Sequence, residues 1–182
     1  MELTQNPSVL ELVRKTAELA TPKEIVWIDG SEAQLDSLRK IAVETGELIK
    51  HNEEKLPGCY LNHSDVNDVA RVEGRTFICS KTREAAGPTN NWMDPYEMKA
   101  KLHEILRCAM TDRTMYVIPY SMGVIGTPFA KYGIEITDSI YVVLNMAIMT
   151  RIGTKVLEAL GGSSDVILGV HTKAKLDPEN RY

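Results

Sequence analysis

The stretch RTMYVIPYSMGVIGTPFAKYG, residues 113–133, joins a run of apolar residues to a turn rich in glycine and proline. The apolar part around Val117 predicts a strand. Glycine and proline are strong local turn signals, so the strand should end where they begin. A strand that ends in a glycine-rich turn often binds phosphate, and the stretch could therefore be a phosphate-binding loop or a structural turn. Its glycines are Gly123, Gly126 and Gly133.

A phosphate-binding loop of the Walker type requires the pattern G-x-x-x-x-G-K-[ST], in which main-chain amides surround the phosphates and the lysine neutralises them. Here Gly126 is followed by Thr127 and Pro128, and no Gly-Lys pair occurs in the chain. Pro128 also removes an amide donor where donors would be needed. The dinucleotide-binding pattern G-x-G-x-x-G is absent as well. The residues therefore favour a structural turn.

The composition is that of an ordinary globular protein, with 43 % hydrophobic and 25 % charged residues. A length of 182 residues fits one domain, or one domain with a small annex. The formal net charge of -4 is opposite to the basic excess typical of proteins that bind nucleic acid. We therefore expect no nucleic-acid partner.

The cysteines and the apolar pattern indicate the compartment. Cys59, Cys79 and Cys108 are scattered and form no C-x-x-C pair, which fits a reducing cytoplasm better than a disulfide framework. The first residues lack the basic start and continuous apolar stretch of a signal peptide. No window approaches 18 uncharged apolar residues, so no membrane span is expected. These features predict a cytoplasmic protein without a membrane partner.

Helix and strand signals mix along the chain and predict an α/β domain whose mixed sheet is flanked by helices. Asn6 and Pro7 mark the start of a helix, and Ser31 precedes a second helix that Gly46 closes. The long, apolar, β-branched stretch 140–149 predicts a strand buried on both faces. The other expected elements are strands within 24–29, 68–80, 115–118 and 165–172, and helices over 94–110 and 154–160.

The segment DVARVEG, residues 68–74, places charged residues on a predicted strand. Side chains alternate along a strand, so Val69, Arg71 and Glu73 would share one face. That face could be a solvated edge. It could instead line a cleft, where the Arg71 guanidinium would hold a carboxylate or phosphate through two hydrogen bonds. The residues alone favour the solvated edge and leave the cleft open.

The chain offers no recognisable metal-binding pattern. Its histidines are dispersed, and His103 with Glu104 is not followed by the second histidine of H-E-x-x-H. A zinc site needs convergent nitrogen or sulfur ligands, and the sequence places no such group together. A G-x-S-x-G nucleophile motif is also absent. We therefore predict no metal site in this chain.

Several segments, in this order, resemble the N-terminal domain of the GTP-dependent phosphoenolpyruvate carboxykinases. The resemblance is strongest over 68–161 and extends over nearly the whole chain. GPTNNWMDP, residues 87–95, is similar to the bacterial and archaeal form of that region. The other segments are DVARVEGRTFICS (68–80), RTMYVIPYSMGVIGTPFAKYGIEITDS (113–139) and YVVLNMAIMTRIGTKVLEALG (141–161).

The resemblance implies a function. Members of that family are decarboxylating lyases that convert oxaloacetate and GTP to phosphoenolpyruvate, GDP and carbon dioxide, the committed step toward gluconeogenesis. It further implies a mixed-sheet substrate-binding domain over residues 1–182, in an enzyme that is monomeric when complete. Members of the family are cytoplasmic or mitochondrial, and the scattered cysteines of this chain favour the cytoplasm. By the same resemblance, Arg71 contacts the substrate and Glu73 helps to hold the closed active-site lid.

The resemblance also implies what this chain lacks. The family's phosphate loop, manganese ligands and mobile lid belong to a larger C-terminal part, which should bind GTP, GDP, Mn²⁺ and Mg²⁺. We therefore expect this chain alone to carry no catalytic residue, to bind no metal and to be inactive. Two positions depart from the family pattern: GVIGTP replaces a glycine-proline and GSP sequence, and Ala147 stands where arginine is common. Any contact of that arginine cannot be carried over to this chain.

Two functional hypotheses follow. The first is the N-terminal, substrate-binding part of a GTP-dependent phosphoenolpyruvate carboxykinase. The second is a stand-alone, non-catalytic binding or regulatory domain derived from that family. The first predicts an exposed and unusually apolar face where the remainder of the enzyme would dock.

Overall fold

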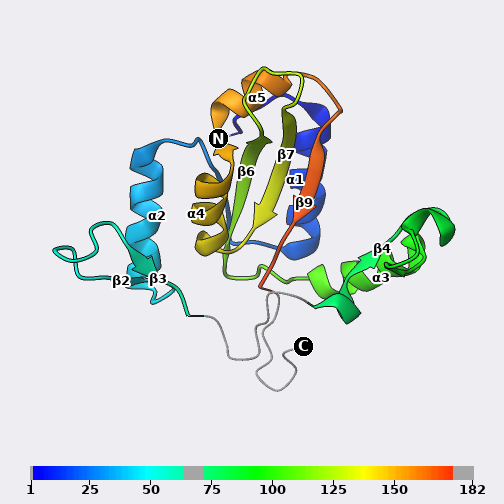
Figure 1. The fold of residues 1–182 in the computed structure, drawn as a ribbon, viewed down its shortest axis with the longest axis horizontal. Coiled ribbons are helices and arrows are strands. Elements are labelled where there is room, and N and C mark those ends of the chain that lie inside the picture. The colour runs from blue at the N-terminus through cyan, green and yellow to red at the C-terminus, as the bar shows by residue number, and fades with distance from the viewer. Residues whose placement is uncertain (1, 64–71, 174–182) are drawn as a thin grey trace.

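The computed structural model describes residues 2–63 and 72–173, and within these ranges the chain folds into a mixed sheet with helices on both faces (Figure 1). The fold class predicted from the sequence is confirmed. The helices are α1 (Pro7–Ala20), α2 (Glu32–Glu44), α3 (Pro95–Leu106), α4 (Ile140–Met149) and α5 (Thr154–Leu160). The strands of the main sheet are β1 (Glu24–Trp27), β6 (Thr114–Met122), β7 (Lys131–Thr137), β8 (Arg151–Ile152) and β9 (Ile167–Val170).

The main sheet has the strand order β1-β6-β7-β9, and β8 pairs with β6. Strands β1 and β6 are parallel, as are β7 and β9, whereas β6 is antiparallel to both β7 and β8. Two short ladders lie outside this sheet. They pair β2 (Ile49–Lys50) with β3 (Tyr60–Leu61), and β4 (Phe77–Ile78) with β5 (Asn91–Trp92).

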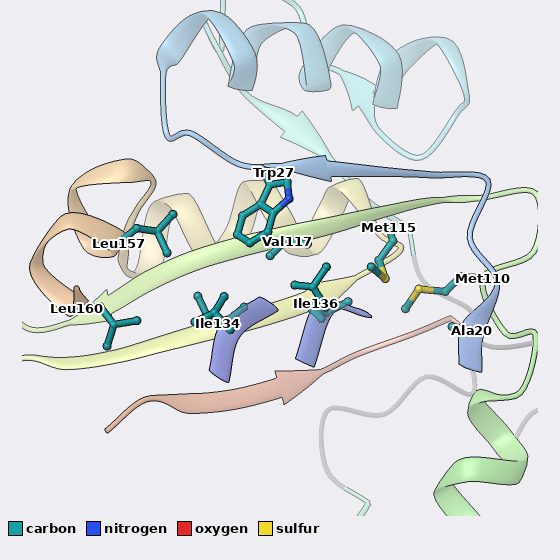
Figure 2. Close-up of a cluster of buried hydrophobic side chains, with 11 residues drawn as sticks. Ala20, Trp27, Met110, Met115, Val117, Ile134, Ile136, Leu157 and Leu160 are labelled. Carbon is teal, nitrogen blue, oxygen red and sulfur yellow. The ribbon is translucent and has the colours of Figure 1, made fainter. Parts of the chain in front are cut away.

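Alternation along β6 divides the interior into two cores. Met115 and Val117 are fully buried against side chains of α1 and α5 (Figure 2). Tyr116 and Ile118 point to the opposite face, where α2 and α4 cover the sheet. Because neighbouring residues of a strand point to opposite faces, one apolar strand can supply both cores.

The stretch 113–133 forms strand β6, a turn and the start of β7. Met122 pairs with Lys131, so residues 123–130 close an antiparallel hairpin. The amide of Gly126 donates to the Tyr132 hydroxyl at 3.0 Å, and the amide of Thr127 donates to the Val124 carbonyl at 3.2 Å. These amides therefore bond within the hairpin, and the prediction of a structural turn is confirmed.

The predicted start of the first helix is also confirmed. The Asn6 side chain accepts hydrogen bonds from the amides of Ser8 and Val9, as expected for a helix cap before proline. Helix α3 ends at Leu106, earlier than predicted from the sequence. The reason is that Cys108 adopts a φ of 54°, and its amide bonds to the Leu19 carbonyl at the end of α1.

The prediction of a strand over 140–149 is wrong, because this segment is helix α4. Its buried residues Ile140, Val143 and Leu144 recur at helical spacing and pack with α2 and the sheet. Tertiary packing on one helix face outweighs the strand preference of β-branched residues. Ala147, at the position where the resemblance expected arginine, is half-buried against the same core.

Two further strand assignments differ from the expectation. Strand β7 was not predicted, although its residues Ile134 and Ile136 are fully buried in the core. Within the described part of 68–80, the strand is limited to Phe77–Ile78, and Glu73–Arg75 form a 3-10 turn, η1. The amide of Thr76 closes this turn by donating to the Glu73 carbonyl at 3.2 Å.

Candidate functional site

The segment that follows Arg71 in the sequence, residues 72–93, forms an irregular loop outside the main sheet (Figure 1). It contains η1 (Glu73–Arg75), a second 3-10 turn, η2 (Glu84–Ala86), and the strands β4 and β5. Phe77 pairs with Asn91 in a parallel ladder, which brings the two ends of the loop together. Residues 77 and 78 are thus held beside residues 91 and 92.

Two side chains of β5 tie this loop together by hydrogen bonds to main-chain oxygens. The Asn91 side-chain amide donates to the Glu73 carbonyl at 2.7 Å and to the Thr76 carbonyl at 3.2 Å. The Trp92 indole nitrogen donates to the Ser80 carbonyl at 3.0 Å. Asn91 therefore spans η1 from its first residue to the residue after its end, whereas Trp92 fastens the loop further along.

A cavity of about 600 Å³ lies beside η1. Its lining offers hydroxyl and amide groups together with the Glu73 carboxylate, but includes no lysine or arginine among the described residues. Such a cavity can hydrogen-bond a small polar molecule, but a dianionic substrate would require a cationic side chain in addition. The lining residues are Val72, Glu73, Gly74, Thr76, Thr89, Asn90 and Asn91.

Of the three residues expected to share a strand face, the structure describes only Glu73. Arg71 and Val69 lie outside the described residues, so their predicted positions are not compared with the structure. Glu73 is described and exposed, but it lies in η1. The prediction that Glu73 shares a strand face with Arg71 is wrong for Glu73, because the backbone turns at that residue. Its role as a lid contact stays a prediction.

Among the described residues, no group of three or more His, Cys, Asp or Glu side chains could hold a metal ion. His171 instead pairs its Nδ1 with the Thr137 hydroxyl at 2.8 Å, and burial lowers the pKa of its imidazole. The described residues also include no helix long and apolar enough to cross a membrane.

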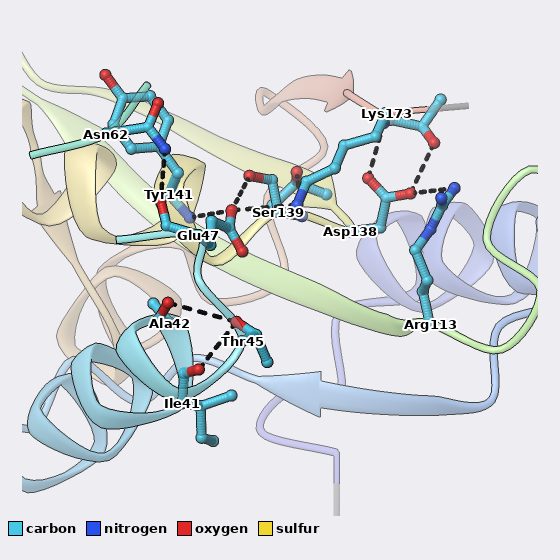
Figure 3. Close-up of polar contacts among 12 residues, drawn as sticks. Ile41, Ala42, Thr45, Glu47, Asn62, Arg113, Asp138, Ser139, Tyr141 and Lys173 are labelled. Atoms are coloured by element: carbon cyan, nitrogen blue, oxygen red, sulfur yellow. Dashed lines mark hydrogen bonds and ion pairs between the residues drawn. The ribbon is translucent and has the colours of Figure 1, made fainter. Parts of the chain in front are cut away.

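A second polar group, the Glu47–Asp138 cluster, lies at the end of β7 and the start of α4 (Figure 3). The Asp138 side chain is fully buried. It accepts bonds from the Arg113 guanidinium at 2.7 Å, the Thr172 hydroxyl at 2.9 Å and the Lys173 amide at 2.9 Å. A buried carboxylate needs such donors to offset its loss of water.

Glu47 completes this cluster at the start of α4. Its carboxylate accepts the Tyr141 amide at 3.0 Å, the Ser139 hydroxyl at 2.9 Å and the Lys173 ammonium at 3.1 Å. Burial of Glu47 by itself would raise the pKa of this carboxyl group. The donors from Tyr141, Ser139 and Lys173 outweigh burial and lower the pKa.

The Glu47–Asp138 cluster is structural, because its carboxylates are bonded by donors of the chain itself. It joins the loop after α2, the β7–α4 corner and the segment after β9. Sequence reasoning missed it, since Glu47 and Lys173 are 126 positions apart. One signal was present: Asp138 and Ser139 directly precede the apolar run, as helix-capping residue types do.

The fold and loop define a mixed α/β domain with a polar cavity beside η1, and without a metal-binding cluster in the described ranges. The model of the phosphoenolpyruvate carboxykinase N-terminal domain matches residues 11–181. The chain belongs to this family.

Relatives carrying the name phosphoenolpyruvate carboxykinase [GTP] match nearly the whole chain. The protein of Anaeromyxobacter dehalogenans strain 2CP-C is 50 % identical over 179 residues, which cover 98 % of this chain and 30 % of the relative. The protein of Corynebacterium kroppenstedtii is 50 % identical over 176 residues, which cover 96 % of this chain and 28 % of the relative. The protein of Neocallimastix frontalis is 50 % identical over 167 residues, which cover 92 % of this chain and 28 % of the relative. The chain thus spans less than a third of the length of these relatives.

Proposed function

We propose that this chain is the N-terminal, substrate-binding part of a GTP-dependent phosphoenolpyruvate carboxykinase. The observation that carries the proposal is the 50 % identity over 98 % of the chain to a relative of that name. The complete enzyme would convert oxaloacetate and GTP to phosphoenolpyruvate, GDP and carbon dioxide. This chain would contribute the binding and orientation of the oxaloacetate or phosphoenolpyruvate anion.

In this proposal Arg71 is the cation that the cavity beside η1 lacks. The described lining of that cavity supplies neutral hydrogen-bonding groups and one carboxylate, and Arg71 directly precedes the lining residue Val72. A guanidinium can hold a substrate carboxylate through two parallel hydrogen bonds, which fixes both position and orientation. Orientation of this kind lowers the barrier without bond making by the arginine itself. Glu73 would hold the closed lid, as the family resemblance implies.

In this proposal the nucleotide and the metal ions bind to the part of the enzyme that corresponds to the unmatched length of the relatives. GTP, Mn²⁺ and Mg²⁺ would bind there, as the family resemblance implies. Among the described residues of this chain, no group of three or more His, Cys, Asp or Glu side chains could hold a metal ion. We therefore assign no metal-dependent step to this chain. The complete enzyme would be monomeric and cytoplasmic and would serve gluconeogenesis.

A turnover assay tests whether this chain is inactive without the remainder of the proposed enzyme. The purified chain with oxaloacetate, GTP and Mn²⁺ should form no phosphoenolpyruvate above the level without protein. Sustained GTP-dependent formation of phosphoenolpyruvate by this polypeptide would contradict the proposal.

The alternative is a stand-alone, non-catalytic binding or regulatory domain. Ala147 favours it, because the resemblance expects an arginine there and an alanine cannot contact an anion or another domain in the same way. The intact mass of the native protein separates the two. A mass near 20.3 kDa would support the stand-alone domain, whereas a mass about three times larger would support the enzyme.

A further inference from the structure

We infer that Asn91 is a positioning residue for substrate binding, acting through the turn η1 that follows Arg71. This inference rests on the proposed function, in which Arg71 holds the substrate anion. The side-chain amide of Asn91 donates to the main-chain oxygens of Glu73 and Thr76, at 2.7 and 3.2 Å. Only Val72 separates Glu73 from Arg71 in the sequence.

The chemistry of these two contacts is specific to an amide side chain. The NH₂ group of asparagine has two donor hydrogens, and Asn91 has an acceptor for each of them. An aspartate of the same shape would place carboxylate oxygens against the two carbonyl oxygens, with no hydrogen to share. Asparagine can therefore make both contacts, whereas aspartate, which has nearly the same shape, cannot.

Little else among the described contacts holds η1 in place. None of its residues, Glu73–Arg75, is buried, and the position of Gly74 has no heavy atom within 4 Å of where a Cβ would lie. The turn's own hydrogen bonds join Arg75 to Val72 and Thr76 to Glu73. These bonds fix the shape of the turn but do not connect it to the rest of the loop. Asn91 makes that connection, from strand β5.

A fixed turn matters because the binding of a small anion by one guanidinium depends on where the chain presents that side chain. Small displacements of a positioning group cost large factors in binding or rate. Asn91 anchors the main chain at Glu73, which lines the cavity beside η1 and lies two residues after Arg71 in the sequence. Asn91 itself needs no contact with the substrate for this effect.

Calorimetric titration of phosphoenolpyruvate into the purified chain tests the inference. We expect Asn91→Ala and Asn91→Asp to weaken binding about five- to tenfold, as expected when a pair of hydrogen bonds is lost. Trp92→Phe is the matched control, because it removes a neighbouring hydrogen bond to the Ser80 carbonyl and keeps an aromatic ring. Its affinity should stay within about twofold of the wild type.

A double-mutant cycle separates positioning through Arg71 from general loosening of the loop. In an Arg71→Lys background, which keeps the charge but lacks the paired donors, Asn91→Ala should cost much less than in the wild type. An equal cost in both backgrounds would overturn the inference. So would an equal loss of affinity in Trp92→Phe.

Comparison of the wild type, Arg71→Ala and Asn91→Ala separates a failure of the inference from a failure of the proposed function. If Arg71→Ala abolishes binding but Asn91→Ala binds as the wild type does, the inference is wrong and the proposed function stands. If the wild-type chain does not bind phosphoenolpyruvate, both fail. Hydrogen exchange at the Thr76 amide provides a readout without ligand: it should become faster in Asn91→Ala and stay unchanged in Trp92→Phe. Unchanged exchange in Asn91→Ala would show that this residue does not hold the turn.

Discussion

The Arg113 guanidinium lies 2.7 Å from the Asp138 carboxylate, and this ion pair joins the start of β6 to the end of the antiparallel strand β7. The Asp138 side chain is fully buried, whereas about a third of the Arg113 side chain remains exposed. Loss of one partner from a buried pair is costly, because it leaves the other charge without compensation.

We therefore expect Asp138→Ala to lower the free energy of unfolding by about 3 kcal/mol. Urea denaturation of the two proteins measures this difference. Glu11→Ala is the control, since Glu11 pairs with Lys15 on the exposed surface of α1 and its removal should have no measurable effect. Equal stability of Asp138→Ala and the wild type would contradict a structural role for the cluster.

The Glu47 carboxylate should make part of the stability dependent on pH. Its pKa is lowered in the folded state, so its contribution is complete above the unfolded pKa of about 4.3 and is lost as the pH falls through the folded-state pKa. Glu47→Gln should therefore be less stable than the wild type at pH 7, and the difference should shrink on acidification.

Denaturation at a series of pH values measures that difference directly. The pKa of His171 is also lowered, so protonation of His171 on acidification lowers the free energy of unfolding of the protein. Because His171 is present in both the wild type and Glu47→Gln, this effect should largely cancel in the difference between them. A difference between the wild type and Glu47→Gln that stays constant from pH 7 to below pH 3 would contradict the assignment.

The parts of the fold that follow local rules could be predicted from the sequence. Asn6 with Pro7 gave the start of α1, and the absence of Gly-Lys indicated that residues 123–130 form a structural turn. These signals depend on residues a few positions apart. Helix α4 could not be predicted in this way, because packing against α2 and the sheet decides between helix and strand for an apolar, β-branched run.

The polar contacts of the site depend on residues far apart in the sequence. Asn91 bonds to the carbonyl of Glu73, 18 positions earlier. Every residue has a main-chain carbonyl, so the residue types do not indicate which carbonyl accepts this bond. Glu73 was identified through the family resemblance, but its strand assignment was wrong because η1 turns the chain at that residue. Arg71, the central residue of the proposed function, lies outside the described residues and stays a prediction.

A close approach of two glycines should make Gly153 intolerant of a side chain. A Cβ at Gly153 would lie 2.1 Å from the Asp29 carbonyl oxygen, and the residue has a φ of 106°. Gly153→Ala should lower the free energy of unfolding by about 2 kcal/mol or more. Gly162→Ala, where no heavy atom lies within 4 Å, should be neutral. Equal behaviour of the two variants in denaturation would be inconsistent with this contact.

The core between the sheet, α1 and α5 should respond strongly to truncation. Ile134 is fully buried there, so Ile134→Ala should cost about 2–5 kcal/mol through lost burial and a residual cavity. Ile148 is 81 % exposed at the end of α4, and Ile148→Ala should have little effect. Thermal or urea denaturation distinguishes the two, and a large loss for Ile148→Ala would indicate a contact that the described residues do not contain.

The exposed apolar side chains provide a further test of the proposed function. Phe129 and Ile148 are 86 % and 81 % exposed, and the proposed function predicts that the remainder of a larger enzyme covers such side chains. Ultracentrifugation of the isolated chain should therefore reveal self-association that Phe129→Ser or Ile148→Ser reduces. A strictly monomeric wild-type chain at high concentration would argue against a covered face at these residues.

The most direct measurement is the affinity of the isolated chain for phosphoenolpyruvate, compared between the wild type, Arg71→Ala and Arg75→Ala. Arg75 is the matched control, because it is an exposed arginine in η1 and does not line the cavity. We predict that the wild type and Arg75→Ala bind phosphoenolpyruvate with affinities within about twofold of each other, and that Arg71→Ala loses at least tenfold. Equal binding by Arg71→Ala and the wild type would contradict the assignment of Arg71 as the substrate-binding residue.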